Sequence, residues 1–135
     1  MIHTHTIIVP FVRGKGRPRF VRATGRAYTP DKTAEAMVAI RAAWEDMTDE
    51  RAPKGTPVSV TIMTTRPLPK SRPKRVVREP DVVKPDADNI AKCALDALNG
   101  VAWDDDTQVT RLNVMKFDRF EWAREETTIT VSWED

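Results

Sequence analysis

The stretch KPDADNIAKCALDALNGVAWDDDTQV, residues 84–109, carries the pattern that decides how this chain folds. Its first half predicts a helix over Asp88–Leu98, because apolar residues recur there at helical spacing and form one face that can pack on a sheet. That face consists of Ile90, Ala94, Ala97 and Leu98. Asn99–Gly100 follow at the C-cap, where glycine commonly ends a helix. A strand is then expected over Gln108–Phe117.

Three further segments predict strands. The run TIIVPFV, Thr6–Val12, is β-branched and aromatic. Two other segments alternate apolar and polar residues with a period of two, which is typical of a half-buried strand. Their apolar members are Val58, Val60 and Ile62 in the first and Ile129, Val131 and Trp133 in the second.

A second helix is expected to begin at Thr29–Pro30–Asp31. A capping hydroxyl, a proline at the first helical position and an acid in the first turn coincide there. The helix should end near residues 51–53. Its apolar stripe consists of Met37, Ile40, Trp44 and Met47.

The order strand, helix, strand, helix, strand, strand predicts one small domain over residues 1–135. The fold class is α/β, of the α+β type, with two main helices packed on a mixed sheet. Residues 13–28, rich in glycine, arginine and proline, are expected to form an extended loop or an irregular hairpin. Residues 66–85, rich in proline and basic residues, are expected to form a long loop.

Charge is unevenly distributed along a chain whose net charge is only +2. Residues 1–30 and 66–78 contain many lysines and arginines and no acid, which indicates a polyanionic partner such as DNA. A solvated basic surface is the alternative. The residues expected to contact DNA phosphates are Lys15, Arg17, Arg19, Arg22, Arg72, Lys74 and Arg75.

Other classes of protein are disfavoured by the sequence. Its apolar runs are much shorter than a membrane span requires, and its N-terminus lacks the pattern of a secretory signal. The single cysteine, Cys93, is expected to be a small buried hydrophobe in a reduced intracellular setting. His3 and His5 are expected on the surface of a frayed terminal strand, since the other ligands of a zinc site are missing.

Acidic residues gather around the first predicted helix. Asp88, Lys92 and Asp96 lie four residues apart and share one face of it, and Asp86 precedes Asp88 by two residues. Asp96 either orients Lys92 or is an exposed helix acid paired with it. A single D-x-D pattern is weak, because it also occurs as a helix cap with an exposed neighbour.

Asp104–Asp106 are expected to join this cluster, because the turn at Asn99–Gly100 would bring the chain back toward the start of the helix. Crowded carboxylates repel one another unless a cation offsets their charge. Mg²⁺ prefers oxygen ligands and can stabilise the charge that develops on a phosphodiester during hydrolysis. Three acids before a strand are by themselves more often a solvated turn.

Residues 85–109, PDADNIAKCALDALNGVAWDDDTQV, resemble the signature of the RusA family of Holliday junction resolvases. That pattern runs P-D-x-D-N, a lysine one turn later, D-A-L, then W-x-D-D-x-Q-V. The N-terminal KGRPRF, residues 15–20, is similar to the basic segment of the same family. The resemblance covers most of the chain.

The resemblance implies a small α/β endonuclease that acts as a homodimer and requires Mg²⁺ or Mn²⁺, with no small-molecule cofactor and no membrane. It would resolve four-way junctions in recombination and repair by paired symmetric cuts, in the cytoplasm of a bacterium or of an infected host cell. The family's essential acids fall on Asp86, Asp88 and Asp106, and its lysine on Lys92. Asp105 is expected as a further metal ligand, and Asp104 as an extra surface acid.

Alternatives remain for both the function and single residues. The chain could be a non-catalytic module that binds branched DNA, or a related nuclease that prefers flaps or forks. Phe20 is a candidate wedge at the junction crossover, and a strand or core position is its alternative. The tryptophans are expected mostly in the core, with Trp103 packed beneath the acids; they are Trp44, Trp103, Trp122 and Trp133.

Overall fold

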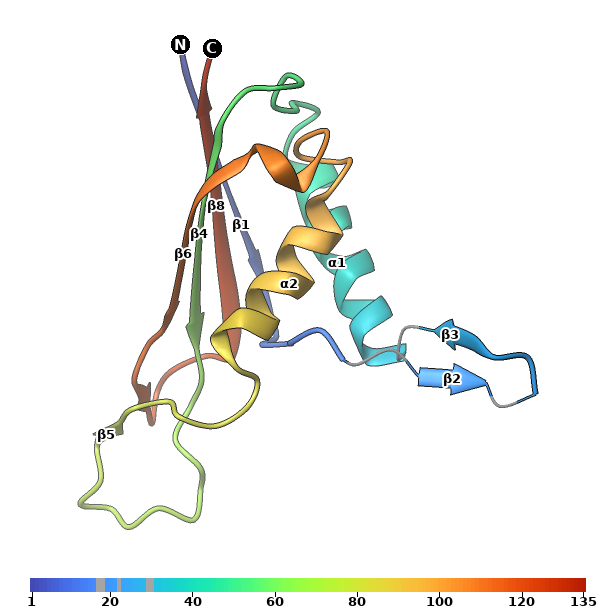
Figure 1. Ribbon diagram of the computed structural model, residues 1–135. Coiled ribbons are helices and arrows are strands. Elements are labelled where there is room, and N and C mark those ends of the chain that lie inside the picture. Colours follow the sequence, from blue (N-terminus) through green and yellow to red (C-terminus); the bar gives the residue numbers. More distant parts are fainter. Residues whose placement is uncertain (17–18, 22, 29–30) are drawn as a thin grey trace.

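The structure, a computed structural model, describes residues 1–16, 19–21, 23–28 and 31–135. It confirms a small α+β domain with two helices packed on a mixed sheet (Figure 1). The elements are β1 (Ile2–Val9), β2 (Arg19–Val21), β3 (Arg26–Tyr28), α1 (Asp31–Met47), β4 (Val58–Thr65), β5 (Arg78–Glu79), α2 (Ala87–Leu98), the 3₁₀ turn η1 (Asp106–Gln108), β6 (Val109–Lys116), β7 (Arg119–Phe120) and β8 (Glu126–Glu134).

The main sheet has the strand order β1-β8-β4-β6. β8 runs antiparallel to both of its neighbours, whereas β6 runs parallel to β4. Val60 lies opposite Val131 on one side and Leu112 on the other. Every second residue of β4 and β8 is buried, as the period-two alternation predicts.

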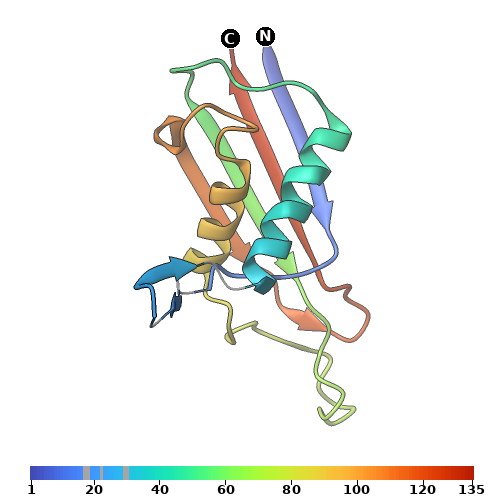
Figure 2. The ribbon, with the colours of Figure 1, turned by 90° about the vertical axis from the view of Figure 1, so that its right-hand side faces the viewer.

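α1 and α2 cover the same face of the sheet, and no helix of the described residues lies on the other face (Figures 1 and 2). Between the helices and the sheet lies the core, in which a fully buried isoleucine contributes about 1.5–3 kcal/mol of stability. Its largest fully buried side chains include Trp44, Trp103, Ile62, Ile90 and Leu98. The apolar face predicted for α2 is confirmed, because all four of its residues are buried.

The parallel pairing of β4 with β6 fixes the direction of α2. Two parallel neighbours need a crossover between them, and α2 provides it. α2 therefore begins at the end of the sheet where β4 ends, and it finishes at the end where β4 and β6 begin (Figure 1). The two ends of α2 thus belong to opposite ends of the molecule.

Several element boundaries differ from the prediction. β1 begins at Ile2 and stops at Val9, earlier than the apolar run suggested, and α1 already ends at Met47. Thr29 and Pro30, the predicted helix cap, lie outside the described residues. Residues 13–28 include the short hairpin of β2 and β3, which agrees with the prediction, whereas the short paired strands β5 and β7 were not predicted.

The N-terminal strand is firmly held at its histidines. His3 Nδ1 lies 2.6 Å from Glu50 Oε2, and its Nε2 lies 2.9 Å from Asp135 Oδ1. The hydrogen bond with Asp135, together with the charges of both acids, raises the pKa of His3. Its ring stacks on Trp133 at a centroid distance of 5.1 Å. The expectation of a frayed strand is therefore wrong, because the C-terminus and the loop after α1 pack against it.

The outcome for the remaining core residues is mixed. Cys93 is buried as predicted, and burial raises its thiol pKa to about 11. Trp44, Trp103 and Trp133 are core residues, but Trp122 is 85% exposed in the turn between β7 and β8. Within the described ranges, neither α1 nor α2 is long and apolar enough to cross a membrane.

Candidate active site at the start of α2

Two aspartates stand at the N-terminus of α2. Asp86 is the N-cap residue with an extended backbone, and its carbonyl accepts the first helical hydrogen bond, 3.0 Å from the amide of Ile90. The carboxylate of Asp86 makes no capping bond. Asp88 lies in the first turn, and both side chains are exposed. Both carboxylates are therefore accessible to a ligand.

A cleft of about 690 Å³ opens beside Asp86. Its walls come from the segment after β1 and from the start of α2. The lining residues are Val12, Arg13, Gly14, Lys15, Gly16, Lys84, Pro85, Asp86 and Asn89. Arg13 and Lys84 are exposed cations at this cleft. Their positive charges reduce the repulsion between the Asp86 carboxylate and an approaching anion such as a phosphate group.

Gly14 explains how closely the two walls approach each other. A Cβ atom at this position would lie 2.8 Å from the Cβ of Pro85 and 3.0 Å from that of Asn89. The amide of Lys15 donates a hydrogen bond of 3.0 Å to the carbonyl of Asn89. Only glycine permits this packing without displacing the start of α2.

The side chain of Lys15 is bound by an acid of α2. Its ammonium group forms an ion pair and hydrogen bond with the carboxylate of Asp96. Asp96 therefore pairs with Lys15, whereas both interpretations from the sequence paired it with Lys92. Lys15 was expected to contact DNA phosphates, and in this structure part of its charge is already neutralised.

The segment after α2 does not return toward the helix start. Gly100, with φ of 77°, turns the chain as expected. The amide of Ala52 then donates to the carbonyl of Ala102 at 2.9 Å, and Trp103 is fully buried. Gln108 Nε2 bonds to backbone carbonyls of the loop before β4. The expected reversal is wrong, because these contacts hold the segment at the end of the sheet where β6 begins.

Asp104 and Asp105 both have structural partners at this far end. Asp104 pairs with Arg51 at 2.7 Å, which agrees with its expected role as a surface acid. Asp105 caps the 3₁₀ turn, where the Gln108 amide side chain and the Asp105 carboxylate bond reciprocally to backbone groups. The hydroxyl of Thr107 also donates to Asp105, at 2.8 Å.

Asp106 has the more unusual environment. The indole N–H of Trp103 donates to Asp106 Oδ1 at 2.8 Å, so the tryptophan packs beneath the acids as predicted. Burial raises the pKa of Asp106, and the charges of Asp96 and Asp105 act in the same direction. The hydrogen bond from Trp103 offsets only part of this effect. A half-buried carboxylate with a raised pKa is a common feature of functional sites.

The aspartates suit a hard divalent cation in their chemistry but not in their number within one copy of the chain. Asp86 and Asp88 supply exposed oxygen donors, which Mg²⁺ prefers. Among the residues that the structure describes, no three Asp, Glu, His or Cys side chains lie close enough to hold a metal ion. The twelve residues of α2, about 18 Å long, separate Asp86 from the segment that carries Asp106.

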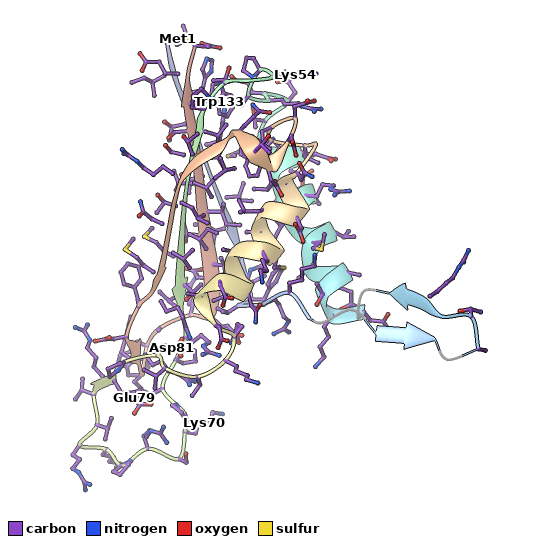
Figure 3. The ribbon with its side chains drawn as sticks, viewed as in Figure 1. Met1, Lys54, Lys70, Glu79, Asp81 and Trp133 are labelled. Atoms are coloured by element: carbon purple, nitrogen blue, oxygen red, sulfur yellow. The ribbon has the colours of Figure 1, made fainter. Side chains whose placement is uncertain are left out.

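Four of the other basic residues selected on sequence lie on α2 or in the loop that leads to it. Lys92 is exposed one turn after Asp88. Arg72, Lys74 and Arg75 are exposed in the loop that leads to α2, the loop that carries Lys70 in Figure 3. Arg17 and Arg22 lie outside the described residues, and only the backbone of Arg19 and Phe20 is described. DNA contacts by these residues remain a prediction.

Arg13 and Lys84 were missing from the residues selected on sequence. Arg13 belongs to the acid-free N-terminal block, and Lys84 directly precedes the Pro85–Asp86 pair. Their position at the cleft was not predictable, since it depends on the packing of the segment after β1 against the start of α2. Adjacency to the P-D-x-D-N motif was the available signal for Lys84.

The chain is similar to a known protein family and to a curated protein. The family model described as Endodeoxyribonuclease RusA matches residues 10–132. The uncharacterized protein YqaN of Bacillus subtilis (strain 168) is 41% identical over 69 residues, which cover 45% of this chain and 49% of that protein. The chain thus matches about half the length of this curated relative.

The raised pKa of Asp106 leads to a stability prediction. A folded-state pKa above the unfolded value means that ionised Asp106 destabilises the fold at pH 7. Asp106→Asn keeps the oxygen that accepts from Trp103 and removes the charge, so its free energy of unfolding at pH 7 should exceed that of the wild type. The gain should shrink as the pH falls toward the unfolded pKa of 3.8.

Urea unfolding at pH 7 and pH 4 measures this difference. Asp104→Asn is the matched control, since it removes a charge from an exposed ion pair that contributes about 0–1 kcal/mol. A lower stability of Asp106→Asn at pH 7 would mean that the ionised carboxylate supports the fold.

Proposed function

From its membership of the RusA family of endodeoxyribonucleases, we propose that this chain cuts four-way DNA junctions in a reaction that depends on a divalent cation. One observation carries the proposal. Asp86 of the P-D-x-D-N motif lines a cleft bordered by cations from two separate segments, and Asp88 is exposed two residues later in the first turn of α2. Such a cleft suits a phosphodiester, which needs positive charge along the strand and carboxylates at the point of cleavage.

The cations of the cleft hold the DNA backbone. Arg13 and Lys84 contact phosphates without reading the sequence, so they bind the shape of the junction. Arg72, Lys74 and Arg75 extend this surface along the loop before α2. Lys92, one helical turn from Asp88, orients a phosphate oxygen near the acids.

Asp86 and Asp88 bind the cation, Mg²⁺ or Mn²⁺, together with Asp106 and Asp105. When bound, such an ion supplies Lewis-acid stabilisation of the phosphodiester. Asp86 and Asp88 provide oxygen ligands from a rigid helix start, and the Trp103 indole fixes one oxygen of Asp106. Because these acids occupy opposite ends of α2, a single copy offers only part of this ligand set.

A homodimer brings the parts together. β6 is an outer strand of the sheet and exposes Leu112 and Met115, and α2 lies over the half of the sheet next to this edge (Figure 2). A second copy, related by a two-fold axis and paired along β6, would run its α2 antiparallel to the first. The start of one α2 then faces the end of the other. A monomeric mass by light scattering would exclude this arrangement.

The dimer also fits the substrate. A four-way junction has approximate two-fold symmetry, so two equivalent sites make paired cuts on symmetry-related strands. We assign the chain to junction resolution in recombination and repair, in the cytoplasm of a bacterium or of a virus-infected cell.

Asp88→Asn tests the catalytic assignment. Cleavage of a synthetic four-way junction in Mg²⁺ should fall on the order of a hundredfold or more, because even neighbours of metal ligands cost 10–100-fold. Junction affinity in metal-free buffer should stay unchanged. Asp104→Asn, the same change at a surface acid, should cleave like the wild type. An Asp88→Asn protein that cuts at the wild-type rate would refute the assignment.

The same assay on junction, flap, fork and linear duplex separates the alternatives. Faster cleavage of flaps or forks would indicate a related nuclease. Binding of junctions without cleavage under any divalent ion would indicate a non-catalytic module.

Lys84→Ala tests the cationic cleft. Removing one phosphate contact should lower the slope of log affinity against log salt by about one unit. Lys54→Ala is the control, because Lys54 lies at the opposite end of the molecule from the loop that leads to α2 (Figure 3). Filter binding to a four-way junction across a salt series measures both slopes. Equal slopes for wild type and Lys84→Ala would show that Lys84 does not contact phosphate.

A further inference from the structure

Arg66 follows the last residue of β4 and binds a buried acid. Its Nε donates to Asp81 Oδ2 at 3.0 Å, and its Nη2 donates to Asp81 Oδ1 at 2.6 Å. The Asp81 side chain is only 1% exposed. Arginine and carboxylate joined by two hydrogen bonds fix each other in distance and in orientation.

The same guanidinium group reaches the backbone just before the candidate active site. Its Nη2 donates to the carbonyl of Val83 at 3.3 Å, and its Nη1 donates to that of Lys84 at 3.0 Å. Lys116, at the end of β6, donates to the carbonyl of Val83 at 2.6 Å. The ends of two sheet strands therefore hold residues 81–84, and Asp86 follows after a single proline.

Asp81 is ionised in this environment. Burial by itself would raise its pKa, but the hydrogen bonds and charge of Arg66, with the charge of Lys116, more than offset that effect and lower the pKa. A buried carboxylate that is paired in this way is strongly destabilised when its partner is removed. Arg66 and Asp81, here called the clamp, are thus both charged at neutral pH.

A second arginine–carboxylate pair in the same loop provides a comparison. Arg72 Nε lies 3.1 and 2.9 Å from the two carboxylate oxygens of Glu79. This pair is more exposed, and the bond lowers the pKa of Glu79. Glu79 and Asp81 lie close together at the base of the molecule (Figure 3). The two pairs differ because Arg66 also binds the carbonyls of Val83 and Lys84, just before Asp86.

We propose that Arg66 and Asp81 are positioning residues, which fix the backbone of Asp86 relative to the sheet and so place its carboxylate for cleavage. This inference rests on the proposed function. The segment that carries Gly14 also packs closely on the start of α2, since a Cβ atom at Gly14 would clash with Pro85 and Asn89. A misplacement of about 1 Å can cost on the order of a hundredfold in rate.

The test compares Asp81→Asn and Arg66→Lys with Glu79→Gln. Asp81→Asn and Glu79→Gln make the same acid-to-amide change two residues apart, and Arg66→Lys keeps the charge but loses the paired hydrogen bonds. Single-turnover cleavage of a four-way junction in Mg²⁺, at saturating enzyme, should slow about 10–100-fold in the first two variants. Junction affinity in metal-free buffer should stay within about twofold of the wild type. Glu79→Gln should cleave at the wild-type rate, because saturating enzyme separates the rate from any change in affinity that the release of Arg72 causes.

Amide hydrogen exchange of residues 82–90 provides a readout that does not need activity. Asp81→Asn and Arg66→Lys should speed exchange in this segment, while exchange in β4 and β8 stays slow. Slow cleavage with unchanged exchange, or equal loss of rate in Glu79→Gln, would overturn the positioning role. A wild-type protein that cuts no DNA would refute the proposed function, and the exchange data would still decide whether the clamp orders residues 82–90.

Discussion

β6 lies parallel to β4, and this pairing determines where the aspartates of residues 84–109 are found. Parallel neighbours require a crossover, which α2 supplies, so the helix starts where β4 ends and finishes where β6 begins. Asp86 and Asp88 consequently lie at one end of the sheet, and Asp106 lies at the other. No turn geometry at Gly100 can change this while β4 and β6 remain paired in their present register.

The features that were predicted correctly depend on residues close together in the sequence. The apolar face of α2 and the alternation in β4 and β8 follow from the spacing of side chains along the chain. The path after Gly100 was not predictable, because Gln108 bonds to carbonyls of Pro53 and Thr56, more than 50 residues away in the sequence. Lys15 is similar: it belongs to an acid-free block, yet the fold sets it beside Asp96.

The two parts of the candidate site, the start of α2 and Asp106, differ in how the fold holds them. The start of α2 is rigid, because Arg66 and Asp81 hold the residues before it and the Gly14 segment packs against it. The ionised carboxylate of Asp106 lowers the stability of the fold at neutral pH, because its burial favours the neutral form and raises its pKa. Such a residue is readily explained if it is retained for chemistry.

In the proposed dimer, Asp86 and Asp88 of one copy act with Asp106 of the other, and mixing subunits that carry different substitutions tests this sharing of acids. Asp88→Asn and Asp106→Asn chains, co-expressed with different tags and purified as a mixed dimer, should regain cleavage of one junction strand, because one of the two shared sites is then intact. A mixed dimer of Asp86→Asn and Asp88→Asn should stay inactive, because neither site is intact. If the first mixed dimer is as inactive as its parents, the acids do not act across the dimer.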